Sequence, residues 1–263
     1  MKDLTNYREA DGSIIYFEAH SSLKSTHELA KYYASEKGYP DRFVVYTERL
    51  RKSKVTTKAN AEVEYDHGIF MSCILRPSIF PSQAAMLSAM AAVGLATGLE
   101  AHTDKPIGLG WISDVYCDGV KIGTASLEGK LDDFTTYEYI IVSFSVKINK
   151  EQFPPRLEDM VKSVFQKGKT SLNTVNMIMA KSILSNFLKF YQNLRTPQGF
   201  MDAYNEKFIF RGKKIKYYRD EKWKSHKVLG IDTRNGELIL DNGAKPDIRV
   251  SSPTLIQNPK KVR

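Results

Sequence analysis

The stretch LGWISDVYCDGVKIG, residues 109–123, places Trp111, Asp114 and Lys121 in an apolar pattern that an Asp-Gly pair interrupts. Asp-Gly between two apolar runs is a strong signal of a tight turn, so the stretch predicts two antiparallel strands. The three residues have ordinary explanations, since Asp commonly starts a turn, Trp is usually core and a lysine beside a turn is usually solvated. A lysine on a rigid strand also suits contacts to carboxylate and phosphate oxygens. The stretch therefore predicts a hairpin and leaves its chemistry open.

Outward from this hairpin, alternation and cap signals predict strands and helices on both sides. The predicted strands cover residues 13–19, 42–48, 68–77 and 137–148, and the predicted helices cover residues 25–38, 82–98, 156–166 and 171–194. Ser25 and Glu28 have the spacing of a capping box, and Ser82 is the expected N-cap of the second helix. The longest apolar run, Ala84–Leu99, is short for a membrane span and rich in small residues, which predicts a buried core helix.

The pattern changes near residue 205, where short alternating segments are joined by Asn-Gly turns at residues 235–236 and 242–243. This pattern is typical of a small all-β module. The expected fold class is α+β, with a mixed β-sheet covered by helices over residues 1–204 and a small β-barrel over residues 205–263.

Composition limits the function classes. The chain has 263 residues, 42% of them hydrophobic and 26% charged, which is ordinary for a globular protein, and a net charge of +9 that favours phosphate-bearing or acidic partners. The N-terminus lacks the apolar segment of a secretory signal, so a cytoplasmic location without membrane contact is expected. Cys73 and Cys117 are expected to be free buried thiols, and five scattered histidines without zinc-ligand spacing argue against a structural metal.

Several motifs resemble those of the bacterial biotin protein ligases in the biotin/lipoate protein ligase superfamily, over about residues 15–255. The family's Ser-Thr-Asn motif matches Ser25-Thr26, with His27 in place of asparagine, and its Leu-Arg-Pro motif is intact at residues 75–77. The family's Lys-Trp-Pro-Asn-Asp motif aligns with residues 110–114, its Lys-Ile-Gly-Gly-Ile-Leu-x-Glu strand with residues 121–128, and its Gly-Ile-Gly-Ile-Asn-x-Asn strand with residues 143–149.

This resemblance implies a class II synthetase-like biotin/lipoate ligase domain followed by an SH3-like β-barrel. It also implies a member without the N-terminal DNA-binding domain that some relatives carry, since little chain precedes the first predicted strand. The activity that it implies has two steps: a carboxylate attacks the α-phosphate of ATP to give an acyl-adenylate, and a lysine of a carrier protein then displaces AMP.

The chain departs from the family at several motif positions. Gly110 stands where the family has lysine, and Ser143 and Ser145 stand where it has strand glycines. The family's glycine-rich loop, expected near residues 52–58, is replaced by KSKVTTK, and no glycine lies between Gly38 and Gly68. Glycines in such loops let backbone N–H groups approach phosphate, so the segment 49–58 keeps positive charge but loses that backbone freedom.

The resemblance assigns roles to particular residues. Lys121 is the expected catalytic cation, and Asp114 is a second catalytic candidate and a weak ligand for Mg²⁺ accompanying ATP. The expected substrate-binding residues, for biotin or a related small carboxylate, are Ser25, Thr26, Trp111, Gly123, Ser143 and Ser145. The expected nucleotide-binding residues are Arg49, Arg51, Lys52, Lys54 and Asn149. The implied partners are a biotin carboxyl carrier-type acceptor protein and, as in many relatives, a second copy of the chain in a homodimer.

Two other functions stay open. The replaced motif residues fit a pseudoenzyme, a non-catalytic protein that binds a ligand or a partner on a ligase fold. The segment 207–227 interleaves basic and aromatic residues as single-strand nucleic-acid surfaces do, although alternation in a small barrel would bury the aromatics and expose the lysines without any ligand. Nucleic-acid binding is therefore the least favoured of the three.

Overall fold

The computed structural model describes residues 2–8, 12–51, 65–81, 84–147, 172–194, 196, 198–252 and 255–257. Two compact units form, Met1–Pro81 with Ser126–Lys181 and Ser82–Ala125 with Ser182–Arg263. A large mixed sheet with helices and a second, smaller sheet confirm the predicted α+β class. The units follow contacts in space, and the predicted domain boundary at residue 205 stays a prediction.

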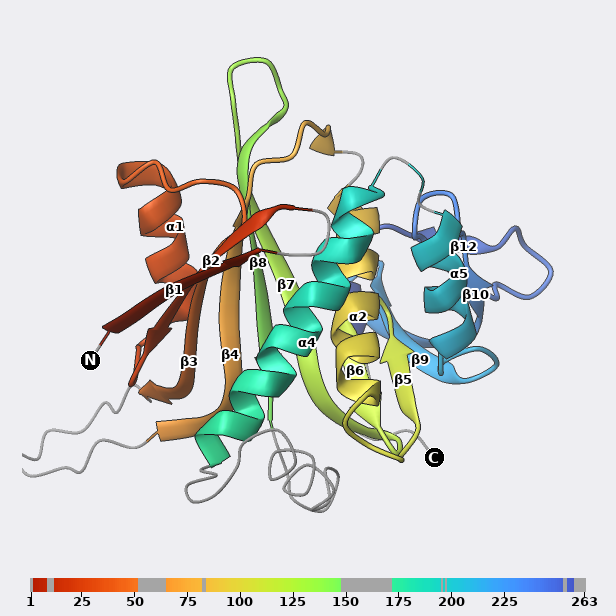
Figure 1. The fold of residues 1–263 in the computed structure, drawn as a ribbon. Helices are drawn as coiled ribbons and strands as arrows, with labels where there is room; N and C mark the ends of the chain where they lie inside the picture. The colour runs from red at the N-terminus through yellow and green to blue at the C-terminus, as the bar shows by residue number, and fades with distance from the viewer. Residues whose placement is uncertain are drawn as a thin grey trace, which may run out of the picture. The chain divides into compact units, whose positions relative to one another are not determined.

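The first unit contains most of the mixed sheet (Figure 1). Its strands are β1 (Lys2–Arg8), β2 (Ile14–His20), β3 (Phe43–Arg51), β4 (Tyr65–Leu75), β8 (Tyr137–Val146) and the second half of β7 (Val120–Leu131). They are hydrogen-bonded in the order β1-β2-β3-β4-β8-β7, and β2 pairs with β3 in parallel whereas β1–β2, β3–β4 and β4–β8 are antiparallel. Helix α1 (Thr26–Glu36) lies against β3, β4 and β8. Residues such as Ala30, Phe43 and Ile141 form the core between helix and sheet.

Helix α1 begins and ends where the sequence predicts. The Ser25 hydroxyl accepts a hydrogen bond from the Glu28 N–H at 3.1 Å, and Gly38 follows the helix with a φ of 61°. At the other end, the Arg76 guanidinium donates to the carbonyls of Ala34 and Tyr39. Arginine contacts of this kind satisfy carbonyls that the last helical turn leaves without partners. The arginine of the Leu-Arg-Pro motif thus stabilises the end of α1.

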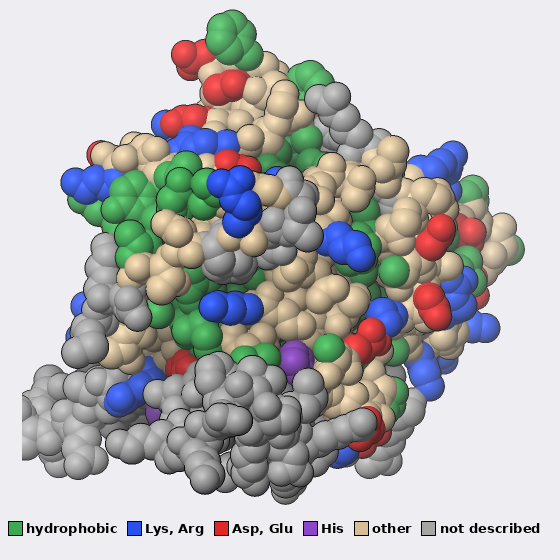
Figure 2. All heavy atoms as spheres, in the orientation of Figure 1, with side chains coloured by type: hydrophobic (Ala, Val, Ile, Leu, Met, Phe, Trp, Pro, Cys, Tyr) green, Lys and Arg blue, Asp and Glu red, His purple; other side chains and the backbone are tan. Residues whose placement is uncertain are grey.

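The connection between β7 and β8 projects from the sheet as a hairpin (Figure 1). Asp132 caps its tip by accepting hydrogen bonds from the backbone N–H groups of Phe134 and Thr136. Phe134 is 84% exposed, and Figure 2 shows a hydrophobic side chain beside acidic ones at this tip.

The second unit combines helices, a strand pair and the small sheet. It contains α2 (Ala84–Glu100), β5 (Ile107–Gly110), β6 (Asp114–Cys117), the first half of β7, α4 (Leu172–Gln192) from Ser182 onward, and α5 (Gln198–Lys207). The small sheet has the order β12-β11-β10-β9-β13. Its strands are β9 (Lys214–Arg219), β10 (Lys222–Ile231), β11 (Leu238–Leu240), β12 (Ile248–Val250) and β13 (Ile256–Gln257). Whether this sheet closes as an SH3-like barrel stays a prediction.

Helix α2 is the predicted core helix, and glycines determine how closely it packs. A Cβ on Gly94 would lie 2.5 Å from the Phe187 backbone, and one on Gly98 would lie 2.4 Å from the Ile183 backbone. Without side chains at these positions α2 and α4 approach backbone to backbone. No helix among the described residues is long and apolar enough to cross a membrane.

Three elements were not predicted: β1, β5 and α5. The helix predicted over residues 156–166 and the predicted cap Ser82 lie outside the described residues. Cys73 and Cys117 are buried and form no disulfide, as predicted. The hairpin predicted within residues 109–123 is confirmed, because Asp118 and Gly119 have φ values of 51° and 71° between β6 and β7. Two positive φ values identify the type I′ turn that suits antiparallel strands.

Candidate functional site

In the second unit, the hairpin brings the two predicted catalytic residues together. Lys121 Nζ lies 2.7 Å from Asp114 Oδ1, across the paired strands β6 and β7. The Asp114 side chain is only 11% exposed, whereas the Lys121 side chain is 35% exposed. A carboxylate held this deeply needs a charged or hydrogen-bonding partner. The pair therefore holds an ammonium group in place while leaving part of it open to solvent.

Two buried tyrosines accompany Asp114. Burial raises the pKa of the Tyr116 and Tyr204 hydroxyls, and the nearby Asp114 charge raises both further. Tyr204 donates its hydroxyl hydrogen to the carbonyl of Gly110 at 2.9 Å. Both phenols therefore stay protonated at neutral pH.

The structure gives a physical reason for the glycine at position 110. A Cβ built there would lie 2.9 Å from Tyr116 and 3.0 Å from Phe210. These two rings meet edge to face, with centroids 5.7 Å apart. Aromatic packing therefore occupies the space that the lysine expected from the resemblance would need.

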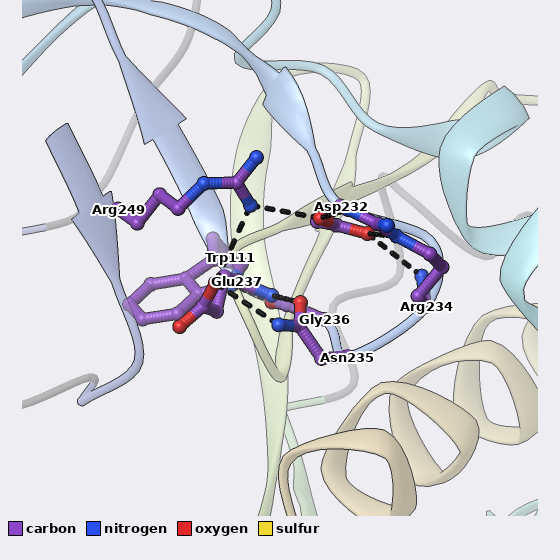
Figure 3. Close-up of polar contacts among 7 residues, drawn as sticks. All are labelled: Trp111, Asp232, Arg234, Asn235, Gly236, Glu237 and Arg249. Carbon is purple, nitrogen blue, oxygen red and sulfur yellow. Dashed lines mark hydrogen bonds and ion pairs between the residues drawn. The ribbon is translucent and has the colours of Figure 1, made fainter. Parts of the chain in front are cut away.

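Trp111 has a structural partner (Figure 3). Its side chain is buried, and its indole N–H donates to the carbonyl of Gly236 at 2.8 Å. The turn that carries Gly236 is held by Asp232, whose carboxylate accepts hydrogen bonds from Arg234 and Arg249. These guanidinium groups hold the pKa of Asp232 well below its usual range. A core role accounts for Trp111, and its predicted contact with a ligand stays a prediction.

Asp114 is also the predicted Mg²⁺ ligand. Magnesium in nucleotide sites typically takes one or two protein carboxylates together with phosphate oxygens, so a single carboxylate fits this type of site. The same oxygen pairs with Lys121. No group of three or more acidic, histidine or cysteine side chains placed to hold a metal occurs within the described ranges.

In the first unit, a continuous chain of side-chain hydrogen bonds crosses the sheet under α1. Ser72 and Ser143 face each other on β4 and β8, and their hydroxyl oxygens lie 2.8 Å apart. Ser72 donates to the hydroxyl of Thr26 at 2.9 Å, while Ser143 lies 2.9 Å from His27 Nδ1. The other ring nitrogen of His27 lies 2.7 Å from a carboxylate oxygen of Glu128, which also accepts a hydrogen bond from Lys31. We call Thr26, Ser72, Ser143, His27, Glu128 and Lys31 the polar chain.

The outer end of the polar chain is charged. The hydrogen bond from Lys31, followed by that from His27, holds the pKa of Glu128 below its ordinary value. The same contact raises the pKa of Lys31. A surface pocket of about 240 Å³ adjoins this end, and it is lined by Lys31, Glu128, Gly129, Lys130, Tyr139 and Ile141.

The remaining predicted site residues are spread over both units. Ser25 caps α1, and half-buried Ser145 lies opposite Phe70 across β4 and β8. Gly123 is buried opposite Val115 in the second unit. Arg49 and Arg51 are exposed on the last part of β3, where Arg51 reaches the Ser22 hydroxyl at 3.4 Å. Lys52, Lys54 and Asn149 lie outside the described residues.

Sequence reasoning missed Ser72 and Lys31 and gave His27 no role beyond replacing an asparagine. Ser72 carried a weak signal, since it is the one hydroxyl in the apolar run Ile69–Leu75. Glu128, the last residue of the strand motif at residues 121–128, pairs with His27 and Lys31. The contacts of His27 and Lys31 depend on how α1 crosses β7 and β8, which no local pattern encodes.

Comparison with known proteins points to one group. No family model matches the chain. The chain is 26% identical over 185 residues to the bifunctional ligase/repressor BirA of Bacillus spizizenii, a match that covers 70% of this chain and 55% of that protein. It is 25% identical over 186 residues to BirA of Bacillus subtilis, with the same coverage. The chain thus spans about half the length of the curated relatives it matches.

Solved structures agree with the sequence matches. The biotin protein ligase of Aquifex aeolicus in complex with biotin and ATP has a TM-score of 0.62 at 18% identity, covering 92% of this chain and 97% of that one. A biotin protein ligase-like protein of unknown function from a Silicibacter species has a TM-score of 0.64 at 15% identity, covering 94% and 96%. The chain is thus similar in sequence to two BirA proteins over 70% of its length, and it has the fold of the biotin protein ligases.

Proposed function

We propose that this chain is an ATP-dependent ligase that activates biotin, or a related small carboxylate, as an acyl-adenylate. In the second step a lysine of a biotin carboxyl carrier-type protein displaces AMP. The relatives named above, and a structural neighbour that binds both biotin and ATP, support this reaction class.

The observation that carries the proposal is the Lys121–Asp114 pair. Adenylate formation brings two anions together, so a cation placed beforehand lowers the cost of their repulsion. Asp114 restricts the position of the Lys121 ammonium, and the 35% exposure of that side chain leaves hydrogens for carboxylate or phosphate oxygens. Lys121 is thus the proposed catalytic residue and Asp114 its positioning residue.

Other residues have supporting roles in this proposal. Thr26, Ser143 and Ser145 would contact the acid, with Ser25 holding the start of α1. Arg49 and Arg51 would supply charge for the phosphates, together with Lys52, Lys54 and Asn149 of the undescribed residues. Magnesium held by Asp114 and the nucleotide would neutralise phosphate charge. A cytoplasmic location and a homodimer belong to the same proposal.

A mass-spectrometric assay for acyl-adenylate tests the proposal. The protein is incubated with Mg-ATP and, separately, with biotin, lipoate and octanoate. We expect an adenylate with one of these acids and a loss of roughly 100-fold or more in Lys121→Ala, as for the removal of one preorganised donor. Lys207→Ala is the matched control, because Lys207 is also ion-paired in the second unit, to Glu100 at 2.5 Å. Adenylate formed at the wild-type rate by Lys121→Ala would refute the role of this lysine.

A second function is favoured by the polar chain, namely a non-catalytic protein on the ligase fold. Ser143 and Ser72 use their hydroxyl groups on each other and on their neighbours, so these groups are not available to a ligand without rearrangement. The absence of any adenylate from folded wild-type protein, together with no heat of binding for ATP or the three acids in calorimetry, would establish this function instead.

A further inference from the structure

The hairpin formed by β9 and β10 has two different faces. The inner face carries buried Ile215 and Tyr217 with half-buried His226. The outer face carries three directly opposed pairs, all of whose members are exposed. These pairs are Lys214–Lys227, Lys216–Ser225 and Tyr218–Trp223, and we call the six residues the outer stripe.

The charge of the outer stripe is unusual for a sheet. Lys214 and Lys227 are direct cross-strand neighbours, and like charges in that arrangement destabilise a strand pair. The two acidic residues of the hairpin, Asp220 and Glu221, lie in its turn, and Asp220 is engaged by Arg219 and Lys224 of the opposite face. Neither acidic residue of the hairpin therefore pairs with a lysine of the stripe.

The aromatic residues of this segment divide into two groups. Phe208, Phe210 and Tyr217 are buried, as expected for the inside of a small β-module. Tyr218 and Trp223 are instead 39% and 49% exposed, with ring centroids 5.2 Å apart. The expectation that alternation buries the aromatics is thus wrong for this pair. The rings stabilise the hairpin as a cross-strand pair, and they also present aromatic surface to solvent at the end of a lysine column.

We propose that the outer stripe binds single-stranded nucleic acid, with the lysines contacting phosphates and the Tyr218–Trp223 pair contacting bases. Exposed aromatics beside a positively charged track are the two components of sequence-tolerant single-strand binding, because every base has a π-face. An acidic protein is the weaker fit, since protein interfaces are depleted in lysine and enriched in arginine, and the stripe contains three lysines and no arginine.

Tryptophan fluorescence gives a direct readout of this binding. The chain has two tryptophans, and Trp111 is buried, so quenching by an added ligand reports on Trp223. The full chain is titrated with unlabelled oligothymidylate to follow tryptophan quenching, and fluorescein-labelled oligothymidylate is titrated with the protein to follow anisotropy. Both titrations are repeated from low to physiological salt.

We expect quenching and salt-dependent binding in the wild-type protein. Trp223→Ala should weaken binding by roughly five- to 150-fold, the usual effect of removing a base-stacking ring, and Trp223→Phe should restore most of it. The double variant Lys214→Ala/Lys227→Ala should lower the slope of log K against log salt by about 1.4, since each single-strand phosphate contact contributes about 0.7.

The matched control is Lys222→Ala/Lys224→Ala, which removes the same charge from the opposite face of the same hairpin. An equal loss of affinity in both double variants would refute the proposal that the outer stripe is the binding surface. The absence of any quenching at low salt would refute it as well. Quenching by polyglutamate or by phosphatidylserine vesicles without oligonucleotide binding would also overturn the proposal in favour of a protein or membrane partner. Circular dichroism of each variant separates loss of binding from loss of fold.

Discussion

The two units depart from the ligase motifs in opposite directions. In the first unit, Ser143 adds a hydroxyl where the resemblance implies glycine, and it hydrogen-bonds to His27, which replaces one polar side chain, asparagine, by another. In the second unit, Gly110 removes a polar group where the resemblance implies lysine, and the rings of Tyr116 and Phe210 fill the space. The first change builds a polar network and the second builds apolar packing.

The two kinds of packing should differ in how well they tolerate substitution. Close-packed rings cannot move aside for a longer side chain without strain, because protein interiors have few voids. Removing one side chain from the polar chain costs the hydrogen bonds of that side chain but does not force neighbouring atoms to overlap. We therefore expect substitutions in the second unit to cost more stability than substitutions in the polar chain.

The largest effect is expected for Gly110→Lys, which introduces the lysine that the resemblance implies. The new side chain would overlap Tyr116 and Phe210 and would bury an ammonium group, so we expect a loss of about 3 kcal/mol in the free energy of unfolding. Urea denaturation measures this loss. Gly110→Ala is the control and should lose about 1 kcal/mol, because its Cβ alone lies 2.9 Å from the Tyr116 ring. Wild-type stability in Gly110→Lys would mean that the rings are not close-packed.

Local patterns predicted the elements whose signals lie within a few residues. The Asp118-Gly119 turn and the Ser25 cap are found where the sequence places them. Helix α5 was missed because its residues have weak helix signals and the Asn-Gly turns further along suggested an all-β segment. Strand β1 was missed because it is short and polar, and it is held by pairing along the whole of β2.

The candidate site was less predictable than the fold. The resemblance named Lys121 and Asp114 separately, and the ion pair between them, which was not predicted, lies within one hairpin. The polar chain joins α1, β4, β7 and β8, and its contacts link residues between 46 and 116 positions apart in the sequence. Such contacts depend on strand order and helix placement, which periodicity does not encode.

A smaller effect is expected for Ser143→Ala, which interrupts the polar chain at its centre. The change leaves buried Ser72 and half-buried His27 each without one hydrogen-bond partner, so we expect a loss of about 1.5 kcal/mol in urea denaturation. Ser145→Ala is the matched control, two residues along the same strand and outside the chain, and should change stability by less than about 0.5 kcal/mol. Equal effects of the two substitutions would show that the hydrogen bonds of Ser143 add nothing to folding.

The smallest effect is expected for Glu128→Gln at the exposed end of the polar chain. Lys31 and His27 hold the folded-state pKa of Glu128 below its ordinary value of 4.5, so the carboxylate stabilises the fold fully above that value. This contribution is lost as the pH falls from 4.5 through the lowered pKa, because protonation removes the charge in both states. The stability difference between wild type and Glu128→Gln should therefore shrink as the pH falls below about 4.5.

Urea midpoints of wild type and Glu128→Gln, measured from pH 7 to pH 3, test whether the stability difference shrinks at low pH. The matched control is Glu138→Gln, which removes an exposed carboxylate that pairs with Lys130 at 2.7 Å on the same hairpin. It should have the smaller effect at pH 7, since Glu128 contacts both Lys31 and His27, whereas an exposed single pair contributes little. A Glu128→Gln difference that persists unchanged at pH 3 would have to come from packing. In that case Glu128 would stabilise the fold through packing, as the rings around Gly110 do. The two units would then no longer differ in what stabilises them.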